Sequence, residues 1–206
     1  MTPANSQEGN GASSPVGEAN PFMVKMEVEP AHRAQADRLV SVFARSFDEA
    51  DHAFDFEKAM AAAQAHPGIA VVGTTNRSLK EERTTVSAAA KTVERVLGET
   101  LSEVGAPGDI QLTDTVIKAF DHLGEQQANP WFRLLESTGR STTYQYNLFF
   151  VLQGPETGAV MIGAPVSLEV TVDVDKKTLF GRLQHRKVSY GIQVKGLTLV
   201  EPLTAP

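Results

Sequence analysis

The 206-residue chain contains no cysteine. This absence excludes disulfide bonds, thiolate catalysis and zinc sites built on cysteine ligands. The sequence also has no run of about 18 apolar residues, so it predicts no transmembrane helix. Residues 1–21 lack the basic start and the apolar stretch of a Sec signal peptide. We therefore expect any entry into a membrane to require the rearrangement of a fold that is stable in water.

The charge balance is mildly acidic, with 25 acidic residues, 19 basic residues and a net charge of −6. An acidic surface repels phosphate backbones, so we expect no nucleic-acid partner. The same charge argues against recruitment by anionic lipid alone. The remaining composition, with 41% hydrophobic and 21% charged residues, is typical of a globular domain that buries a sizeable core.

Few groups are arranged for catalysis or metal binding. The five histidines are scattered and form no HExxH pair: His32, His52, His66, His122 and His185. No G-x-S-x-G elbow, Walker loop or G-x-G-x-x-G motif occurs. Asp173 and Asp175 form a DxD pair, for which an acidic turn at a strand end is a simpler interpretation than a metal site. We therefore predict a protein that is not an enzyme and uses no cofactor.

Residues 1–20 are rich in glycine, serine, asparagine and proline and show no apolar periodicity. This composition predicts a disordered tail. The tail is either a leader without function or a removable pro-segment, and the residues favour neither. A single folded domain is expected over residues 21–206.

The first half of the chain predicts two helical hairpins, over residues 30–65 and 79–126. A strand at 22–28 precedes them, and a short one at 69–72 separates them. The first helix begins at Pro30, where proline is favoured. Its apolar stripe consists of Ala36, Leu39, Val40, Phe43, Ala44 and Phe47. A second helix is expected near 56–65.

The second hairpin is predicted from a capping pattern. The segment Ser78-Leu79-Lys80-Glu81 matches a capping box. It predicts a long helix that ends near Val104. The sequence Gly105-Ala106-Pro107-Gly108 then forces a turn, and a fourth helix is expected over 109–126.

From residue 129 onward the sequence predicts strands. Expected strands cover 131–137, 143–153, 159–174 and 188–200, with a hairpin loop at 154–158. The apolar parity of the last strand changes near Gly196, which suggests a bulge. Helices first and hairpin-linked strands later indicate an α+β fold with a mainly antiparallel sheet.

The strand pair at 143–174 is long and apolar enough to span a bilayer, since a tilted membrane strand needs about 9–11 residues. Its candidate membrane-interacting residues share one face: Tyr144, Tyr146, Leu148, Phe150, Val160, Ile162, Val166, Leu168 and Val170. The alternative interpretation is an ordinary sheet core beneath helices, and the pattern alone leaves both open.

A second candidate surface is the segment 176–187, which contains five basic residues and no acidic one. The basic residues are Lys176, Lys177, Arg182, Arg186 and Lys187, and the interleaved apolar residues are Leu179, Phe180 and Leu183. A basic segment with interleaved apolar residues suits a lipid interface. The alternative is a charged sheet edge that discourages aggregation.

The second half of the chain resembles the Cyt δ-endotoxins. The shared pattern includes a TxYxYN strand that starts at Thr143, an aromatic-aliphatic run that ends in Gln153, and a TGxVM hairpin exit at 157–161. A PVxxE strand starts at Pro165. Trp131, Ser189-Tyr190 and Glu201-Pro202-Leu203 also match. The resemblance covers 131–203 in detail and 22–128 as an order of elements.

This resemblance implies a single-domain, three-layer α/β/α cytolysin with two helical hairpins around a central sheet. It implies a toxin that binds membrane phospholipid directly, without an obligatory protein receptor, and self-associates on the membrane. Lysis would follow by pore formation or detergent-like disruption, after proteolytic activation at the termini. The protein would act extracellularly, after release. The alternative function is a non-lytic lipid-binding virulence factor or carrier.

Limited digestion with proteinase K tests the proposed boundary. Because the composition changes between Ala19 and Phe22, digestion is expected to remove the tail near Pro21 and to leave nearly all of the rest intact. Mass spectrometry of the resistant fragment measures this. Rapid cutting within 86–104 or 144–174 would contradict the predicted fold.

Overall fold

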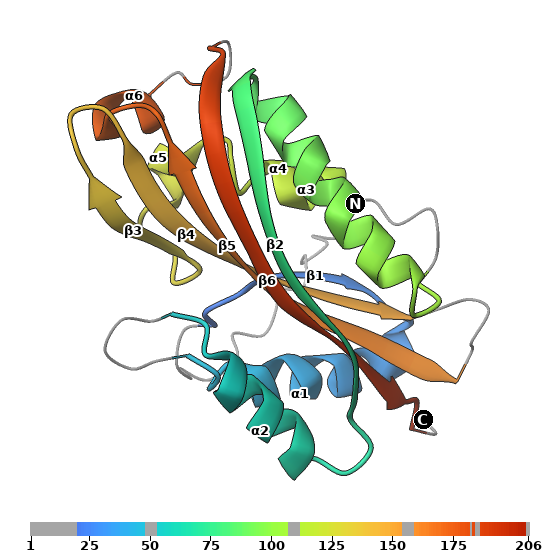
Figure 1. Ribbon diagram of the computed structural model, residues 1–206. Helices are drawn as coiled ribbons and strands as arrows, with labels where there is room; N and C mark the ends of the chain where they lie inside the picture. Colours follow the sequence, from blue (N-terminus) through green and yellow to red (C-terminus); the bar gives the residue numbers. More distant parts are fainter. Residues whose placement is uncertain are drawn as a thin grey trace, which may run out of the picture.

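The computed structural model describes residues 20–47, 53–106, 112–153, 159–181, 183 and 186–204 (Figure 1). Its first part contains β1 (Met23–Glu27), η1 (Pro30–His32), α1 (Arg33–Phe43), α2 (Phe56–Ala65), β2 (Ala70–Thr84) and α3 (Val86–Ser102). Its second part contains α4 (Thr113–Ile117), α5 (Leu123–Gln126), β3 (Phe132–Ser137), β4 (Thr142–Gln153), β5 (Val160–Val172), α6 (Lys176–Leu179) and β6 (Val188–Pro202).

One mixed sheet organises the molecule, with the strand order β1-β4-β5-β6-β2. The pairs β4–β5, β5–β6 and β2–β6 are antiparallel, whereas β1 runs parallel to β4. Both β1 and β3 pair with the same edge of β4. β3 occupies its first half, from Thr142 to Tyr146, and β1 occupies its second half, from Leu148 to Leu152. The expected α+β fold with a mainly antiparallel sheet is confirmed.

The two faces of the sheet have different covers. Even-numbered side chains of β4, β5 and β6 point toward α3, α4 and α5, and we call this side the α3 face. Odd-numbered side chains of the same strands point to the other side, the α1 face, part of which packs against α1 and α2. Figure 1 shows α1 and α2 along the lower part of the sheet and α3 beside its upper part. Each face therefore builds its own hydrophobic core.

Several predicted elements are confirmed. The helix at 56–65 coincides with α2, and the strands at 131–137, 143–153 and 159–174 match β3, β4 and β5 within two residues. The first helix starts at Pro30 with a short 3-10 turn and continues as α1, which buries Ala36, Leu39 and Phe43. The hairpin loop predicted at 154–158 lies outside the described residues.

The capping box at Ser78 is a wrong prediction. Ser78 lies in the middle of β2, a 15-residue strand that pairs with β6 along most of its length. The helix begins eight residues later, where Thr85 is the N-cap and accepts a hydrogen bond from the backbone nitrogen of Ala88 at 3.3 Å. Long-range pairing with β6 overrides a local pattern that is worth only about 1 kcal/mol.

The fourth helix predicted at 109–126 is also wrong as one element. Residues 107–111 lie outside the described residues, and the remainder forms two short helices, α4 and α5. His122 separates them with a left-handed backbone, at φ 52°. The break allows Phe120 and Leu123 to pack together into the core of the α3 face.

The bulge predicted near Gly196 is absent from β6, and the nearby register shift in the β2–β6 pairing, between Val71 and Gly73, places the extra residue in β2. The register continues from Val160 opposite Pro202 to Val172 opposite Tyr190 without a shift. The parity changes because Leu197 and Leu199 are buried on the α1 face, whereas Ile192 and Val194 are buried on the α3 face. The parity of the buried residues therefore changes because different helices cover the two ends of β6, and the register between β5 and β6 stays the same.

Replacing Val170 with aspartate tests the assignment of the α3 face. Val170 is fully buried, so the variant places an unpaired charge in the core and should lose about 3 kcal/mol or more of unfolding free energy. Thr171→Asp is the matched control, since Thr171 is half-buried on the opposite face. Urea denaturation followed by circular dichroism measures both. Equal stability of the two variants would refute the assignment.

Candidate functional site

The nine apolar candidates of the strand pair form one continuous surface on the α3 face. Cross-strand partners place Tyr144 beside Val170, Tyr146 beside Leu168, and Leu148 beside Val166. All nine are buried except Val160, which is half-buried. Tyr190, Ile192 and Val194 of β6 extend the surface by one strand. The structure thus brings the predicted residues together, and in this state helices cover them.

Apolar packing and a few polar contacts hold the covering layer. Val93, Leu97 and Leu101 of α3 lie in the same core as the strand residues. The Tyr144 hydroxyl donates to the backbone oxygen of Ala119 at 2.7 Å, and the Tyr146 hydroxyl donates to Gln126 Oε1 at 2.5 Å. The layer is therefore attached to the sheet at specific points as well as by its area.

The tyrosines of this surface are neutral at physiological pH. Burial raises the pKa of Tyr146 to about 12, against a smaller opposing effect of the neighbouring Trp131. Burial, with a smaller contribution from the charge of Asp121, raises the pKa of Tyr190 to about 12. Burial also holds the pKa of Tyr144 well above 10. The α3 face therefore carries no charge from these phenols.

Two further hydrogen bonds join α3 to β2. Thr75 Oγ1 lies 3.3 Å from Thr100 Oγ1, and Thr92 Oγ1 donates to Glu81 Oε1 at 2.8 Å. A cavity of about 10 Å³, lined in part by Leu97, Phe150 and Val166, lies between α3 and the sheet. It has room for about one water molecule.

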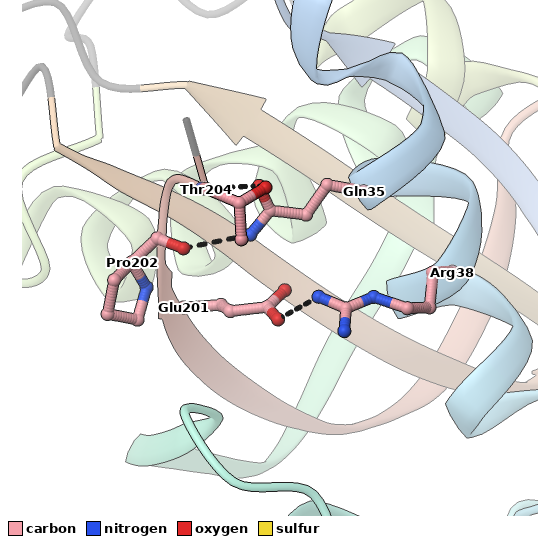
Figure 2. Close-up of polar contacts among 5 residues, drawn as sticks. All are labelled: Gln35, Arg38, Glu201, Pro202 and Thr204. Carbon is pink, nitrogen blue, oxygen red and sulfur yellow. Dashed lines mark hydrogen bonds and ion pairs between the residues drawn. The ribbon is translucent and has the colours of Figure 1, made fainter. Parts of the chain in front are cut away.

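On the α1 face, the end of β6 is fastened to α1 (Figure 2). Gln35 Nε2 donates to the backbone oxygen of Pro202 at 2.8 Å, and Gln35 Oε1 accepts from the backbone nitrogen of Thr204 at 3.0 Å. Arg38 pairs with the buried carboxylate of Glu201. We call these five residues the C-terminal clasp. It connects α1 directly to the sheet.

The α1 face is polar where α1 and α2 do not cover it. Two rows of cross-strand neighbours carry this polarity: Gln145, Glu169, Gln193 and Ser78 in one, and Asn147, Ser167, Lys195 and Asn76 in the other. We call them the polar rows. Gln145 Nε2 donates to Asn147 Oδ1 at 3.1 Å and to Ser167 Oγ at 3.0 Å. Sequence reasoning missed these rows because it followed only the apolar parity, although their alternation was visible.

The basic segment is folded back onto the sheet. Asp175 caps α6 by accepting from the backbone nitrogen of Thr178 at 2.7 Å, and this backbone hydrogen bond lowers the pKa of its carboxyl. Asp175 thus acts as a turn residue. The four described basic residues are exposed: Lys176, Lys177, Arg186 and Lys187. Arg182 lies outside the described residues.

The apolar residues of this segment point inward. Leu179 and Leu183 are buried in the core of the α3 face, and the Phe180 ring lies 6.0 Å from that of Phe132. Lys176 Nζ lies 5.7 Å above the Phe180 ring. In this state Leu179 and Leu183 are withdrawn from the surface, and Phe180 is half-buried. The expected contact of Phe180 with lipid requires this packing to open.

The part of the chain that the structure describes gives little support for a metal site or a membrane-spanning helix. Within it, acidic and histidine side chains form no group of three or more that could hold a metal ion. No helix among these residues combines the length and the hydrophobicity needed to cross a membrane.

The Bacillus thuringiensis toxin family model matches residues 13–206. The chain belongs to this family. It is 31% identical to the type-2Aa cytolytic delta-endotoxin of B. thuringiensis subsp. kyushuensis, over 92% of this chain and 74% of that relative. It is 29% identical to the type-2Bb cytolytic delta-endotoxin of subsp. jegathesan, over 85% of this chain and 68% of that relative.

Solved structures of the family share the fold. The activated Cyt2Ba monomer from B. thuringiensis subsp. israelensis superposes with a TM-score of 0.80 at 28% identity, over 90% of this chain and all of that chain. A second delta-endotoxin structure gives a TM-score of 0.82 at 26% identity, over all of this chain and 94% of that one. The resemblance inferred from the strand motifs is therefore confirmed.

The exposed charge of the basic segment leads to a prediction about membrane binding. Each lysine or arginine near an anionic surface contributes about 1 kcal/mol to binding, and salt screens this attraction. Changing Lys176, Lys177, Arg186 and Lys187 to glutamine should weaken binding to phosphatidylserine-containing vesicles and flatten its salt dependence. Sedimentation of vesicles at several salt concentrations measures both.

The matched control changes Lys58, Lys80, Lys91 and Lys118 to glutamine, which removes the same charge from exposed sites elsewhere. Both variants should melt within about 2 °C of the parent, since exposed substitutions change stability little. Parental binding by the segment variant at low salt would identify the segment as a charged sheet edge.

Proposed function

We propose that this member of the toxin family binds phospholipid bilayers directly and lyses cells by pore formation or detergent-like disruption. The observation that carries the proposal is the α3 face, an apolar surface of three adjacent strands beneath a layer of helices. Membrane phospholipid is the proposed partner, and extracellular target membranes are the proposed place of action. The proposal includes no enzymatic step, no cofactor and no obligatory protein receptor.

The physical reason is an exchange of apolar partners. Burial of apolar surface stabilises a protein by roughly 25 cal/mol per Å², and acyl chains provide the same burial as helices do. A sheet that leaves its helices for lipid therefore loses little apolar stabilisation. Its backbone groups must remain paired, because unpaired polar groups in hydrocarbon are costly. Self-association of several sheets on the membrane would satisfy the edges of β2 and of β1 and β3.

The alternative function, a non-lytic carrier of an acyl chain, has less support. A carrier needs a preformed cavity of several hundred Å³ between helices and sheet. The cavity beneath α3 has a volume of only about 10 Å³. Dye release from phosphatidylcholine vesicles, before and after mild proteolysis, distinguishes the two functions, since a carrier binds without leakage.

A disulfide between α3 and β2 tests whether the helical layer must separate. Thr75 and Thr100 have side-chain oxygens 3.3 Å apart and suit a cysteine pair, and the chain has no cysteine of its own. The oxidised Thr75→Cys/Thr100→Cys variant should release dye at least tenfold more slowly than the parent. Reduction should restore release.

Each single cysteine variant serves as a control, because it carries the substitution without the bond. Thermal melting shows whether the oxidised form is folded. Release at the parental rate by the fully oxidised protein would mean that α3 does not need to leave the sheet.

A further inference from the structure

We propose that the sheet meets acyl chains through the α3 face alone, and that α1 and α2 stay on the sheet while α3, α4 and α5 separate from it. This inference rests on the proposed membrane activity and specifies its contact surface. It differs from the simpler expectation that both helical layers move aside.

The α3 face is apolar along most of the length of β4 and β5. Every even-numbered side chain of β4 from Tyr144 to Leu152 is apolar and buried. The stretch from Tyr144 to Leu152 extends over about 30 Å, at roughly 3.4 Å per residue. It reaches the length of about 9–11 residues that a tilted membrane strand needs. Removal of one layer, α3 to α5, thus uncovers a surface that matches a bilayer.

The α1 face does not match a bilayer. The polar rows cross four strands and contain charged Glu169 and Lys195 along with several amides and hydroxyls. Placing these groups in hydrocarbon would leave charges without water. The α1 face therefore suits an aqueous side, such as the lumen of an assembly or the water above the membrane.

Loss of α1 and α2 would uncover a surface that suits neither water nor lipid. The residues beneath them include Phe149, Val151, Met161, Leu197 and Leu199, and these lie on the same face as the polar rows. In water, this apolar patch would be exposed to solvent. In lipid, the polar rows on the same face would enter the hydrocarbon with it. The hairpin α1–α2 is therefore needed as a permanent cover for its half of the α1 face.

The C-terminal clasp fits this role. Gln35 and Arg38 of α1 bind the last two residues of β6, Glu201 and Pro202, and Thr204 beyond its end. Glu201 is almost fully buried, and its Oε2 has no hydrogen-bond partner among the described residues, so departure of Arg38 would leave that carboxylate unpaired. The clasp holds α1 to β6, an interior strand whose side chains contribute to the cores of both faces.

A second disulfide provides the test, with the Thr75–Thr100 pair as its counterpart. A Cβ placed on Gly163 of β5 would lie 2.8 Å from Leu39 Cδ2 and 3.5 Å from Leu39 Cγ. Shortening Leu39 to cysteine removes the clash and places a sulfur near the position of that Cγ. Oxidised Leu39→Cys/Gly163→Cys therefore locks α1 to the sheet.

The readout is dye release from phosphatidylcholine vesicles by each oxidised protein and by its reduced form. We expect the α1-locked protein to release dye within twofold of its reduced form. The α3-locked protein should be slowed at least tenfold, with recovery on reduction. Because each protein is compared with its own reduced form, a change caused by the substitutions alone cancels.

Three results would contradict the inference. Reversible inhibition by both locks would show that both layers must leave, and the membrane activity itself would stand. Unimpaired release by the α3-locked protein would show that the α3 face need not be uncovered. Absence of release by the parent and by all reduced forms would refute the proposed function, and the inference with it.

A second variant, which disturbs the core less, tests the inference if Leu39→Cys/Gly163→Cys does not fold. A short bifunctional thiol cross-linker can join Gln35→Cys to Thr204→Cys, since Gln35 Oε1 and Thr204 Oγ1 lie 3.1 Å apart. The cross-linked protein should release dye within twofold of the same variant without linker. A tenfold loss after cross-linking would overturn the inference.

Discussion

The α3 face sets the main constraint on this molecule. Three adjacent strands present an almost unbroken apolar surface, and water forces that surface to be covered. The layer α3 to α5 is its cover, and a left-handed backbone at His122 divides the last part of that layer into two short helices. The same surface that requires a cover in water is the one that acyl chains would accept. Stability in water and activity on membranes thus have one physical origin.

The second half of the chain could be predicted because strand alternation is strong there. The even positions of β4 and β5 are apolar almost without exception, so their shared face followed from the sequence alone. The first half was less predictable. Ser78 has a good local capping pattern, and only its pairing with Gln193 across 115 residues makes it part of a strand. No local rule contains that information.

The candidate site was predicted on one face only. The even parity of Tyr144, Leu148 and Val166 predicts one surface, whereas the parity of the odd positions does not predict how they are covered. Those positions divide into an apolar group beneath α1 and the polar rows. The clasp was beyond prediction, because Gln35 and Thr204 are separated by 169 residues and carry no motif. Polar contacts between distant segments depend on the completed topology.

The strand order also determines when the apolar surface can come into existence during synthesis. β1 pairs with β4, and β2 pairs with β6, so neither of the first two strands can pair until a strand more than a hundred residues further along the chain has been made. Such long-range pairings are slow to form and are established late. A nascent chain that still lacks β6 has neither the complete sheet nor the attachment site of α1. The sheet therefore stays incomplete for most of translation. The complete α3 face and the helices that cover it form together.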